Sequence, residues 1–326
     1  MDDQRWFIVG GAGFIGSHFV DALLARPTTT AVTIYDNFTS GRRWHLEPHQ
    51  ADARFAVVEA DVKELDTLTR AIAGHDSVVH LASNPDIALA MTDPDIDFVE
   101  GTLLTRNVVE AMRRADVPRI MYASGSGVYG DLGELEADED HGPLVPVSTY
   151  GASKLAGEAL ISSYAAMFDM SGCAFRFGNV VGPRQTHGVG FDFVRRLLDD
   201  PTQLRILGDG TQSKSYIHVD DVVRAVLLAH DRVEEPFRPF NVATGDYITV
   251  GEIADLAVEV VGLEPGSVSY EYTGGPRGWK GDVPIVRIGT TRIRELGWTC
   301  ERDTRDALRA ALLSLLDDAR AGRLDA

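Results

Sequence analysis

The chain has 326 residues, with 31 Lys and Arg against 49 Asp and Glu, which gives a formal net charge of −18. An acidic surface of this size repels phosphate backbones and anionic lipids over a Debye length, so we expect neither a nucleic acid nor a membrane surface as partner. Hydrophobic residues make up 44% of the chain. This composition, at this length, is typical of one large or two modest globular domains.

The chain shows no sign of targeting or of metal binding. No basic leader with a long apolar run stands at the N-terminus, and no segment approaches the length of a membrane span, which predicts a cytoplasmic protein. The two cysteines, Cys173 and Cys300, lie outside any metal-ligand spacing. They predict free thiols in a reducing compartment, and we expect no metal site.

Short apolar runs alternate with helical patterns over the first 180 residues. Strands are predicted at 6–9, 31–35, 55–59, 77–82, 119–123 and 173–177, and helices at 14–25, 94–115 and 149–168. Continuous apolar strands separated by helices are typical of a parallel sheet covered on both faces. Residues 1–180 are therefore predicted to form an α/β domain, a Rossmann-type doubly wound parallel sheet.

The rhythm breaks after about residue 180. Glycine and proline cluster at 182–183, 208–210 and 274–276, and the chain ends in a helical pattern over 303–319. We predict a smaller, irregular α/β substrate-binding lobe over 181–326, packed against the first domain with some exchange of strands and helices. The site is expected in the cleft between the two.

A glycine-rich turn follows the first predicted strand. Gly10, Gly13 and Gly16 have the spacing G-x-x-G-x-x-G and open a helix. Glycine permits a tight turn and a close approach to a pyrophosphate, and the helix N-terminus offers free N–H donors. This context predicts a dinucleotide site.

The end of the second predicted strand bears on which dinucleotide binds. Asp36 stands twenty residues after Gly16, where a carboxylate accepts both ribose hydroxyls of NAD and repels a 2′-phosphate. The predicted cofactor is NAD. Arg42 and Arg43 follow in the next loop and keep NADP open as an alternative.

Tyr150 and Lys154 stand one helical turn apart, at the start of the predicted helix 149–168. An i, i+4 pair shares a helix face, and a nearby ammonium lowers the pKa of a phenol. The pair therefore predicts a general base that acts on a sugar hydroxyl near neutral pH.

With the glycine turn, Asp36, 80–83, 124–130 and Tyr150-x-x-x-Lys154 in this order, the chain resembles the extended short-chain dehydrogenase/reductase family. Within it, the chain is similar to the nucleotide-sugar epimerases and dehydratases of the UDP-galactose/UDP-glucose 4-epimerase type. The resemblance covers nearly the whole chain. Segments 176–183, 216–222 and 274–283 resemble the substrate-lobe signatures of the family, which are more specific than the glycines.

The resemblance implies roles for individual residues. The cofactor residues it implies are Gly10, Gly13, Phe14, Ile15, Gly16, Asp36, Asn37, Asp61, Val62, Leu81, Ala82, Ser83, Tyr150 and Lys154. The substrate residues it implies are Asn179, His187, Gly188, Val189, Lys214, Tyr216, Arg277 and Asp282. Tyr150 would be the general base, and Lys154 would bind the nicotinamide ribose.

The chain departs from the family pattern at two places. The family has Ser or Thr four residues before the tyrosine of its V-Y-G motif, and this position is Gly125 here. Either neighbour, Ser124 or Ser126, is a candidate for the missing catalytic hydroxyl, and Ser124, at the end of the predicted strand, is preferred over Ser126. The family's Asn before Gly-Thr is replaced by Val99-Glu100, which puts one cofactor contact in doubt.

The same motif bears on the reaction. Dehydratases of the family carry an Asp-Glu pair after the catalytic Thr, and decarboxylases a Glu, where this chain has Ser126 and Gly127. We therefore expect an NAD-dependent 4-epimerase of a nucleotide sugar, with a UDP-sugar as its substrate. A 4,6-dehydratase, a UDP-glucuronate decarboxylase, an NADPH-dependent reductase and a catalytically weak NAD-binding sensor or scaffold remain alternatives. The resemblance also implies a homodimer built on the helices 94–115 and 149–168.

Overall fold

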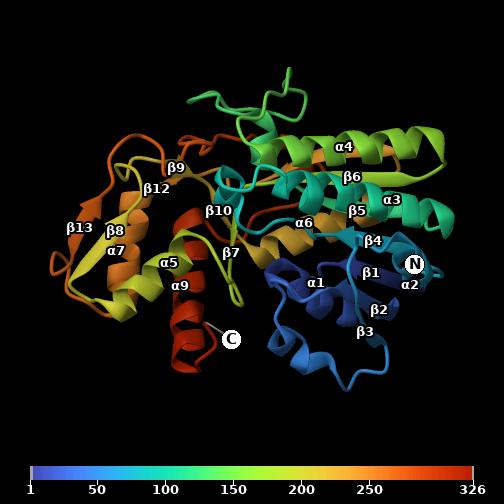
Figure 1. Cartoon of the computed structure of the whole chain (residues 1–326), viewed down its shortest axis with the longest axis horizontal. Helices are drawn as coiled ribbons and strands as arrows, with labels where there is room; N and C mark the ends of the chain where they lie inside the picture. The colour runs from blue at the N-terminus through green and yellow to red at the C-terminus, as the bar shows by residue number, and fades with distance from the viewer. Residues whose placement is uncertain (1–2, 325–326) are drawn as a thin grey trace. The chain divides into compact units, whose positions relative to one another are not determined.

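The computed structural model of the chain describes residues 3–324 and contains two compact units (Figure 1). Unit 1 consists of Met1–Val128, Thr149–Arg176 and Ala225–Phe240, and unit 2 of Tyr129–Ser148, Phe177–Arg224 and Asn241–Ala326. The predicted division at residue 180 thus lies near one observed crossing, and segments 129–148 and 225–240 exchange between the predicted halves. The assignment of cofactor to one half and substrate to the other stays a prediction.

Unit 1 is built on a seven-stranded sheet with the order β3-β2-β1-β4-β5-β6-β11. Its strands are β1 Gln4–Val9, β2 Thr29–Asp36, β3 Phe55–Glu59, β4 Ser77–His80, β5 Arg119–Gly125, β6 Ser171–Phe177 and β11 Phe237–Val242. The pairings from β3 through β5 are parallel. The order 3-2-1-4-5-6 is that of a Rossmann sheet, so the predicted fold class is confirmed. The strand order reverses between β1 and β4, and at such a switch point these sheets bind their ligands.

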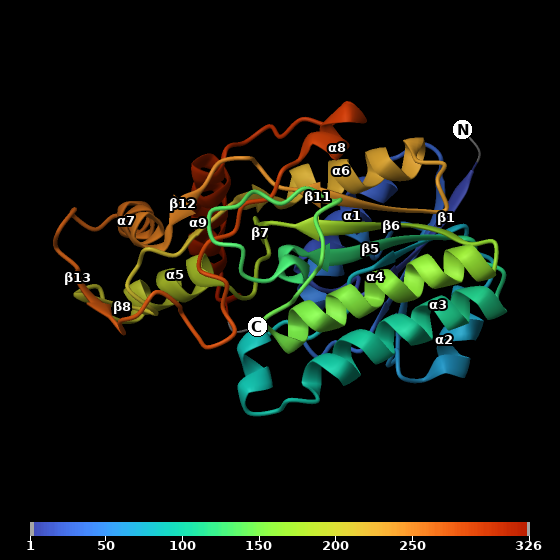
Figure 2. The same ribbon diagram turned by 90° about the horizontal axis from the view of Figure 1, so that it is seen from above.

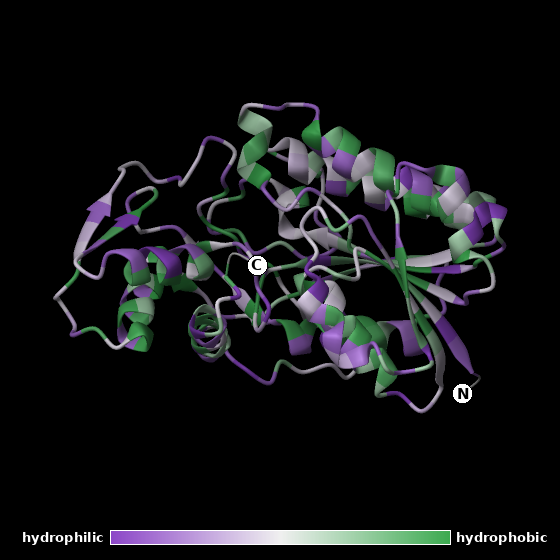
Figure 3. Ribbon diagram, turned by 60° about the horizontal axis from the view of Figure 1, so that its bottom comes forward, coloured by the Kyte–Doolittle hydropathy of each residue, from purple (hydrophilic) through white to green (hydrophobic). Residues whose placement is uncertain are grey.

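Helices cover both faces of this sheet. α2 Leu65–Ile72, α3 Leu104–Arg114 and α4 Thr149–Met167 lie along one face, and α1 Phe14–Leu24 and α6 Val219–Arg232 along the other (Figure 2). The helical ribbons alternate between hydrophobic and hydrophilic residues (Figure 3). This alternation is typical of helices with one face on a core and the other in water.

The predicted helix 94–115 is wrong in its first part. The structure has a π-helix, η3 Phe98–Leu103, followed by α3 Leu104–Arg114. The periodicity of the segment does not show that Gly101 packs closely on α4: a Cβ there would lie 2.7 Å from the Ser153 hydroxyl oxygen. Asp97, just before η3, turns its buried side chain toward Asn84 and Thr149 and does not cap the helix.

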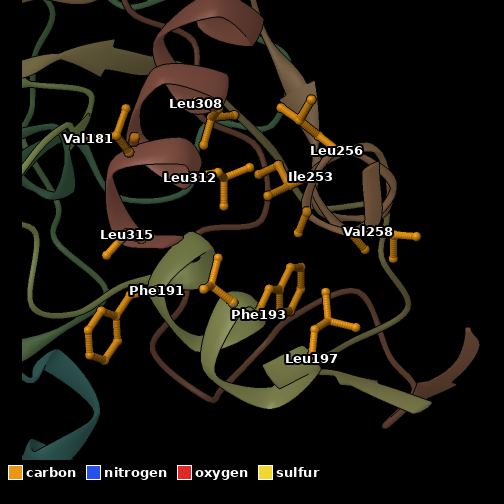
Figure 4. Packing of buried hydrophobic residues seen from close by; sticks show 14 of the residues in the cluster. Val181, Phe191, Phe193, Leu197, Ile253, Leu256, Val258, Leu308, Leu312 and Leu315 are labelled. Atoms are coloured by element: carbon orange, nitrogen blue, oxygen red, sulfur yellow. The ribbon is translucent and has the colours of Figure 1, made fainter. Parts of the chain in front are cut away.

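Unit 2 combines helices with three two-stranded sheets. The helices are α5 Val189–Asp199, α7 Val250–Val261, α8 Thr291–Glu295 and α9 Thr304–Arg320; the strands are β7 Asn179–Val181, β8 Gln203–Ile206, β9 Ser213–Lys214, β10 Tyr216–His218, β12 Ile248–Thr249 and β13 Ser269–Tyr272. The pairs are β10 with β7, β12 with β9 and β13 with β8. α5, α7 and α9 bury one hydrophobic cluster between them, and Figure 4 shows Phe193, Ile253 and Leu312 pointing into it. Among residues 3–324, no helix has both the length and the apolar run needed to cross a bilayer.

The core of unit 2 gives a matched test of packing. Leu312 is fully buried, and its neighbour Leu313 is 48% exposed. Leu312→Ala should lower the free energy of unfolding by about 2–5 kcal/mol because it removes apolar contacts and leaves a cavity. Leu313→Ala should change it by less than about 0.5 kcal/mol. Urea unfolding followed by circular dichroism measures both, and equal losses would contradict this account of the core.

Candidate active site

The glycine turn lies at the switch point of the sheet, between β1 and α1. The N–H groups of Leu81 and Ala82 both donate to the Val9 carbonyl, at 2.9 and 3.1 Å, which brings the loop after β4 beside the turn. Gly10 has a φ of +82°, and a Cβ on Gly16 would lie 2.3 Å from the Gly10 carbonyl oxygen. The turn therefore tolerates no side chain at Gly16.

The first turn of α1 is suited to an anion. Its N-cap is Gly13, which has no side chain to accept the N–H groups at this end of the helix. Unpaired N–H groups and the positive end of the helix dipole favour a pyrophosphate. The turn and helix thus fit the dinucleotide that the sequence predicts.

Asp36 lies at the end of β2 and is 8% exposed. One carboxylate oxygen accepts the N–H of Ala12 at 2.9 Å, and the other accepts the N–H of Phe38 at 2.8 Å. Burial raises the pKa of Asp36, while the two backbone N–H groups act against that rise. These bonds hold the carboxylate beside the glycine turn, and further lone pairs are left for hydroxyl donors.

The basic residues considered for a 2′-phosphate have protein partners. Arg43 pairs with Glu59 at 2.7 Å, and Arg42 donates to the Ser40 carbonyl. A carboxylate beside Arg43 reduces its attraction for a phosphate.

Two further predicted cofactor residues also have partners in unit 1. Asn37 donates to Asp61 at 3.2 Å, and Asp61 accepts the N–H of Lys63. Lys63 reaches Glu100, one of the two residues that depart from the family pattern, at 2.6 Å. Val62 is buried in the core of unit 1.

Tyr150 and Lys154 share the first turns of α4, as predicted. The Lys154 ammonium is buried, donates to the Ala123 carbonyl at 2.8 Å and lies 5.4 Å from the centre of the Tyr150 ring. Burial lowers the pKa of Lys154 to about 8, and the carboxylate of Asp97 acts in the opposite direction.

The expectation of a lowered tyrosine pKa is wrong for the protein alone. Burial and the charge of Asp97 raise the pKa of Tyr150 to about 12, against a smaller lowering by a hydrogen bond with Ser83. Burial is the largest cause of this rise in pKa, and the Lys154 ammonium donates its hydrogen bond to the Ala123 carbonyl. An activated base therefore needs a further positive charge at the site.

The two serines beside Gly125 have different surroundings. Ser124 is buried, and its hydroxyl donates to Glu158 at 2.5 Å. Glu158 also pairs with buried Arg176 at 2.8 Å. Ser126 is only partly buried, and a Cβ placed on Gly125 would meet no atom within 4 Å. Since the Ser124 hydroxyl is already used, Ser126 is the better candidate for the missing hydroxyl.

Unit 2 brings together five of the predicted substrate residues. Asn179 on β7 stands opposite Tyr216 on β10, and Lys214 lies two residues before Tyr216. The Lys214 ammonium contacts the Asp282 carboxylate at 2.6 Å, and Arg277 donates to the Asp282 carbonyl at 2.6 Å. Burial, followed by the charge of Asp282, raises the pKa of Tyr216.

The loop before α5 holds the other predicted substrate residues. Gly188 is the N-cap of α5 and Val189 its first residue, while the His187 carbonyl accepts the Gln185 amide at 2.7 Å. The structure thus brings five of the predicted substrate residues together in one cluster and places the other three at the start of α5.

Sequence reasoning missed two buried carboxylates, Glu158 on α4 and Asp97, whose charge acts on Tyr150. Glu158 follows Lys154 by one helical turn, and this spacing was a usable signal. Asp97 is 1% exposed, yet it stands in the acidic segment 93–97, where nothing in the pattern distinguishes it from exposed Asp93 and Asp95.

Comparison with known proteins agrees with this geometry. The sequence profile of the NAD dependent epimerase/dehydratase family matches residues 6–243. The chain is 34% identical to UDP-glucose 4-epimerase of Mycolicibacterium smegmatis, over 90% of this chain and 93% of that protein. A crystal structure of a UDP-galactose 4-epimerase is 34% identical, has a TM-score of 0.83, and covers 96% of this chain and 99% of that one. The dTDP-glucose 4,6-dehydratase of Streptomyces venezuelae, crystallised with NAD, has a TM-score of 0.89 at 26% identity, over 97% and 98% of the two chains.

The carboxylate of Asp36 gives a test of the cofactor site. Asp36→Ala should weaken NAD binding about tenfold to a hundredfold, because charge-assisted hydrogen bonds to the ribose are lost. Isothermal titration calorimetry on nucleotide-free protein measures the affinity. Asp66→Ala is the control, since that side chain is 83% exposed. An unchanged affinity of Asp36→Ala for NAD would remove Asp36 from the site.

The Glu158–Arg176 pair gives a test of the scaffold behind the tyrosine. Both side chains are 5% exposed, so Arg176→Met leaves a buried, unpaired carboxylate and should cost about 3–5 kcal/mol of unfolding free energy. Arg309 pairs with Glu259 at the surface, where Arg309→Met should cost no more than about 1 kcal/mol. If urea unfolding showed similar losses of unfolding free energy for the two variants, the burial of the Glu158–Arg176 pair would make no difference to its effect on stability.

Proposed function

The chain belongs to the NAD-dependent epimerase/dehydratase family, and we propose that within it this enzyme is a UDP-sugar 4-epimerase. The reaction is a transient oxidation of the sugar at C4 to a 4-keto intermediate, followed by return of the hydride to the opposite face. When NAD is bound, it would accept the hydride from C4 of the sugar and give it back in the same site, which regenerates the oxidised cofactor. The reaction needs no external oxidant or reductant.

The observation that carries this proposal is the absence of an acid/base carboxylate after β5. Positions 126 and 127 hold Ser and Gly. The buried carboxylate of Glu158 already accepts the Ser124 hydroxyl and pairs with Arg176. Asp97 accepts hydrogen bonds from Asn84 and Thr149. An elimination across C5 and C6 needs an acid and a base, whereas epimerisation needs only a group for the C4 hydroxyl proton.

Each step has a residue to perform it. Tyr150 takes the proton of the 4-hydroxyl and later returns it. Ser126 donates or accepts a hydrogen bond at the same oxygen in place of the side chain missing at Gly125. Lys154 binds the nicotinamide ribose and presents a positive charge beneath the phenol. The positive charge of Lys154 favours the phenolate, and bound oxidised NAD would add a second positive charge at the site.

The similarity to UDP-sugar enzymes and the cluster in unit 2 support the choice of substrate. Lys214 and Arg277 are cations suited to a diphosphate, and Asn179 and Asp282 offer polar groups for the nucleoside. His187, Gly188 and Val189 would contact the base. A homodimer and a cytoplasmic location remain predictions from the sequence.

A second candidate is a nucleotide-sugar 4,6-dehydratase. It is favoured by the high TM-score to the dTDP-glucose 4,6-dehydratase, although the 26% sequence identity to that enzyme is lower than the 34% to the UDP-galactose 4-epimerase. The products discriminate the two reactions, since only a dehydratase yields a 4-keto-6-deoxy sugar.

The proposal is tested by incubating the purified enzyme with UDP-glucose, UDP-N-acetylglucosamine and UDP-glucuronate and following the products by NMR. A C4 epimer of at least one substrate is expected. Tyr150→Phe should lower kcat about 10²- to 10⁴-fold, because the general base is lost. A 4-keto-6-deoxy product, loss of carbon dioxide, or full activity of the Tyr150→Phe enzyme would overturn the proposal.

The serine assignment has its own test. Ser126→Ala should lower kcat and leave stability unchanged, since no described core contact depends on that hydroxyl. Ser124→Ala should mainly lower the unfolding free energy, because Glu158 loses a buried donor. The reverse pattern in kinetics and urea unfolding would assign the catalytic hydroxyl to Ser124.

A further inference from the structure

A buried carboxylate joins the two segments that hold the Tyr150 side chain. Asp97 is 1% exposed and stands just before η3. One of its oxygens accepts the Thr149 hydroxyl at 2.7 Å, and the other accepts the Asn84 amide at 3.0 Å. Thr149 is the first residue of α4 and directly precedes Tyr150.

The other partner of Asp97, Asn84, lies in the loop that carries Ser83. Asn84 directly follows Ser83, whose side chain hydrogen-bonds Tyr150. Asn84 also donates to the Asp86 carbonyl at 2.8 Å and accepts the Asp86 N–H at 3.0 Å, so its own side chain is fixed in the loop. Asp97 therefore links Thr149, which precedes Tyr150, to Asn84, which follows Ser83.

The π-helix η3, which follows Asp97, packs closely on α4. Gly101 of η3 lies against Ser153 of α4, where a Cβ would approach the serine hydroxyl oxygen to 2.7 Å. The Ser153 hydroxyl in turn donates to the Tyr150 carbonyl at 2.8 Å. The π-helix and the start of α4 thus meet along the turn that carries the tyrosine.

The charge of Asp97 has no cationic partner in direct contact among the described residues, and both of its hydrogen-bond donors are neutral. Neutral donors leave the negative charge to act on its surroundings. It raises the pKa of both Tyr150 and Lys154.

The other ionisable groups around Lys154 are neutral or already paired. Burial lowers the pKa of His80 on β4 to about 3. The rings of Tyr122 on β5 and Tyr150 on α4 have their centres 5.3 and 5.4 Å from the ammonium. Glu158 on α4 pairs with Arg176. Asp97 is thus the buried carboxylate near Lys154 that no cation compensates in the described structure.

We propose that Asp97 is a positioning residue of this active site: its hydrogen bonds with Thr149 and Asn84 fix the turn of α4 that carries Tyr150, and its buried carboxylate, which no described cation contacts, sets the charge beside that turn. The role of Tyr150 in this inference rests on the proposed function. The two effects are separable, since one depends on hydrogen bonds and the other on charge.

Asp97→Asn removes the charge and keeps the hydrogen bonds. The amide oxygen accepts from Asn84, and the amide nitrogen donates to the Thr149 hydroxyl, which then acts as acceptor. Lys154 should lose its proton at a pH about one unit lower, and the whole pH profile of kcat should move in the same direction, because the pKa of Tyr150 falls too.

Thr149→Val removes one hydrogen bond and keeps the charge. This variant should lower kcat about tenfold without moving the pH profile, and Thr149→Ser should restore kcat. Asp95→Asn is the matched control, because Asp95 is exposed on the same segment, and it should change neither quantity.

The titration of Lys154 is measured directly by NMR of protein labelled with [¹³Cε]lysine. The chain has four lysines, Lys63, Lys154, Lys214 and Lys280, so the signals are few and Lys154→Arg assigns the relevant one. The purified wild type, with whatever cofactor it retains, is compared with Asp97→Asn. A lower titration midpoint in Asp97→Asn, together with the kinetic pattern of Thr149→Val, supports the proposal.

An unmoved Lys154 midpoint in Asp97→Asn would overturn the role of the charge, and unchanged kcat in Thr149→Val would overturn the role in positioning. The NMR titration requires no turnover. If no UDP-sugar is epimerised, the proposed function fails on its own, while the Lys154 titration still decides the electrostatic part of this inference.

Discussion

The candidate active site is built around one buried ion pair, Glu158 with Arg176. Glu158 projects from α4, Arg176 lies on β6, and the hydroxyl of Ser124 at the end of β5 joins the same carboxylate. A helix turns by about 100° per residue, so a pair that fixes one position also fixes the direction of every residue nearby. One turn before Glu158, the Lys154 ammonium meets the Ala123 carbonyl, and one turn before that lies Tyr150. Burying two charges costs free energy. The attraction between Glu158 and Arg176 offsets this cost only when α4 and β6 keep the alignment that brings the two side chains together.

The sequence predicted the sheet well because its signal is local. Continuous apolar strands such as 6–9 and 119–123 fit only an interior position, and the glycine turn stands where β1 meets α1. The start of the predicted helix 94–115 failed because its conformation depends on contacts with α4, such as Gly101 on Ser153, which are distant in sequence. The prediction of a lowered pKa for Tyr150 failed for the same reason, because this pKa also depends on residues that are distant in sequence. Spacing places Lys154 on the same helix face, but it does not reveal that the ammonium bonds the Ala123 carbonyl or that Asp97 is buried nearby.

The substrate cluster of unit 2 shows what residue types alone leave open. The resemblance to the family implied that Lys214, Arg277 and Asp282 bind the substrate, and in the structure both cations contact Asp282. The structure also gives both cations carboxylate partners, Asp282 for Lys214 and Asp131 for Arg277. A diphosphate at this place would compete with these carboxylates, so the cost of separating the pairs enters its affinity. Such competition favours a ligand that brings two adjacent negative charges over one that brings a single charge.

Position 125 shows how little of the surrounding structure depends on one side chain of a motif. No atom lies within 4 Å of where a Cβ would stand, and the glycine φ is not in the left-handed region. A side chain could therefore be gained or lost here by a single codon change, with neither a clash nor a cavity in the neighbouring core. Evolution can thus change the hydroxyl at this position independently of the scaffold. A motif search that requires Ser or Thr at this position would pass over a chain whose site is otherwise assembled.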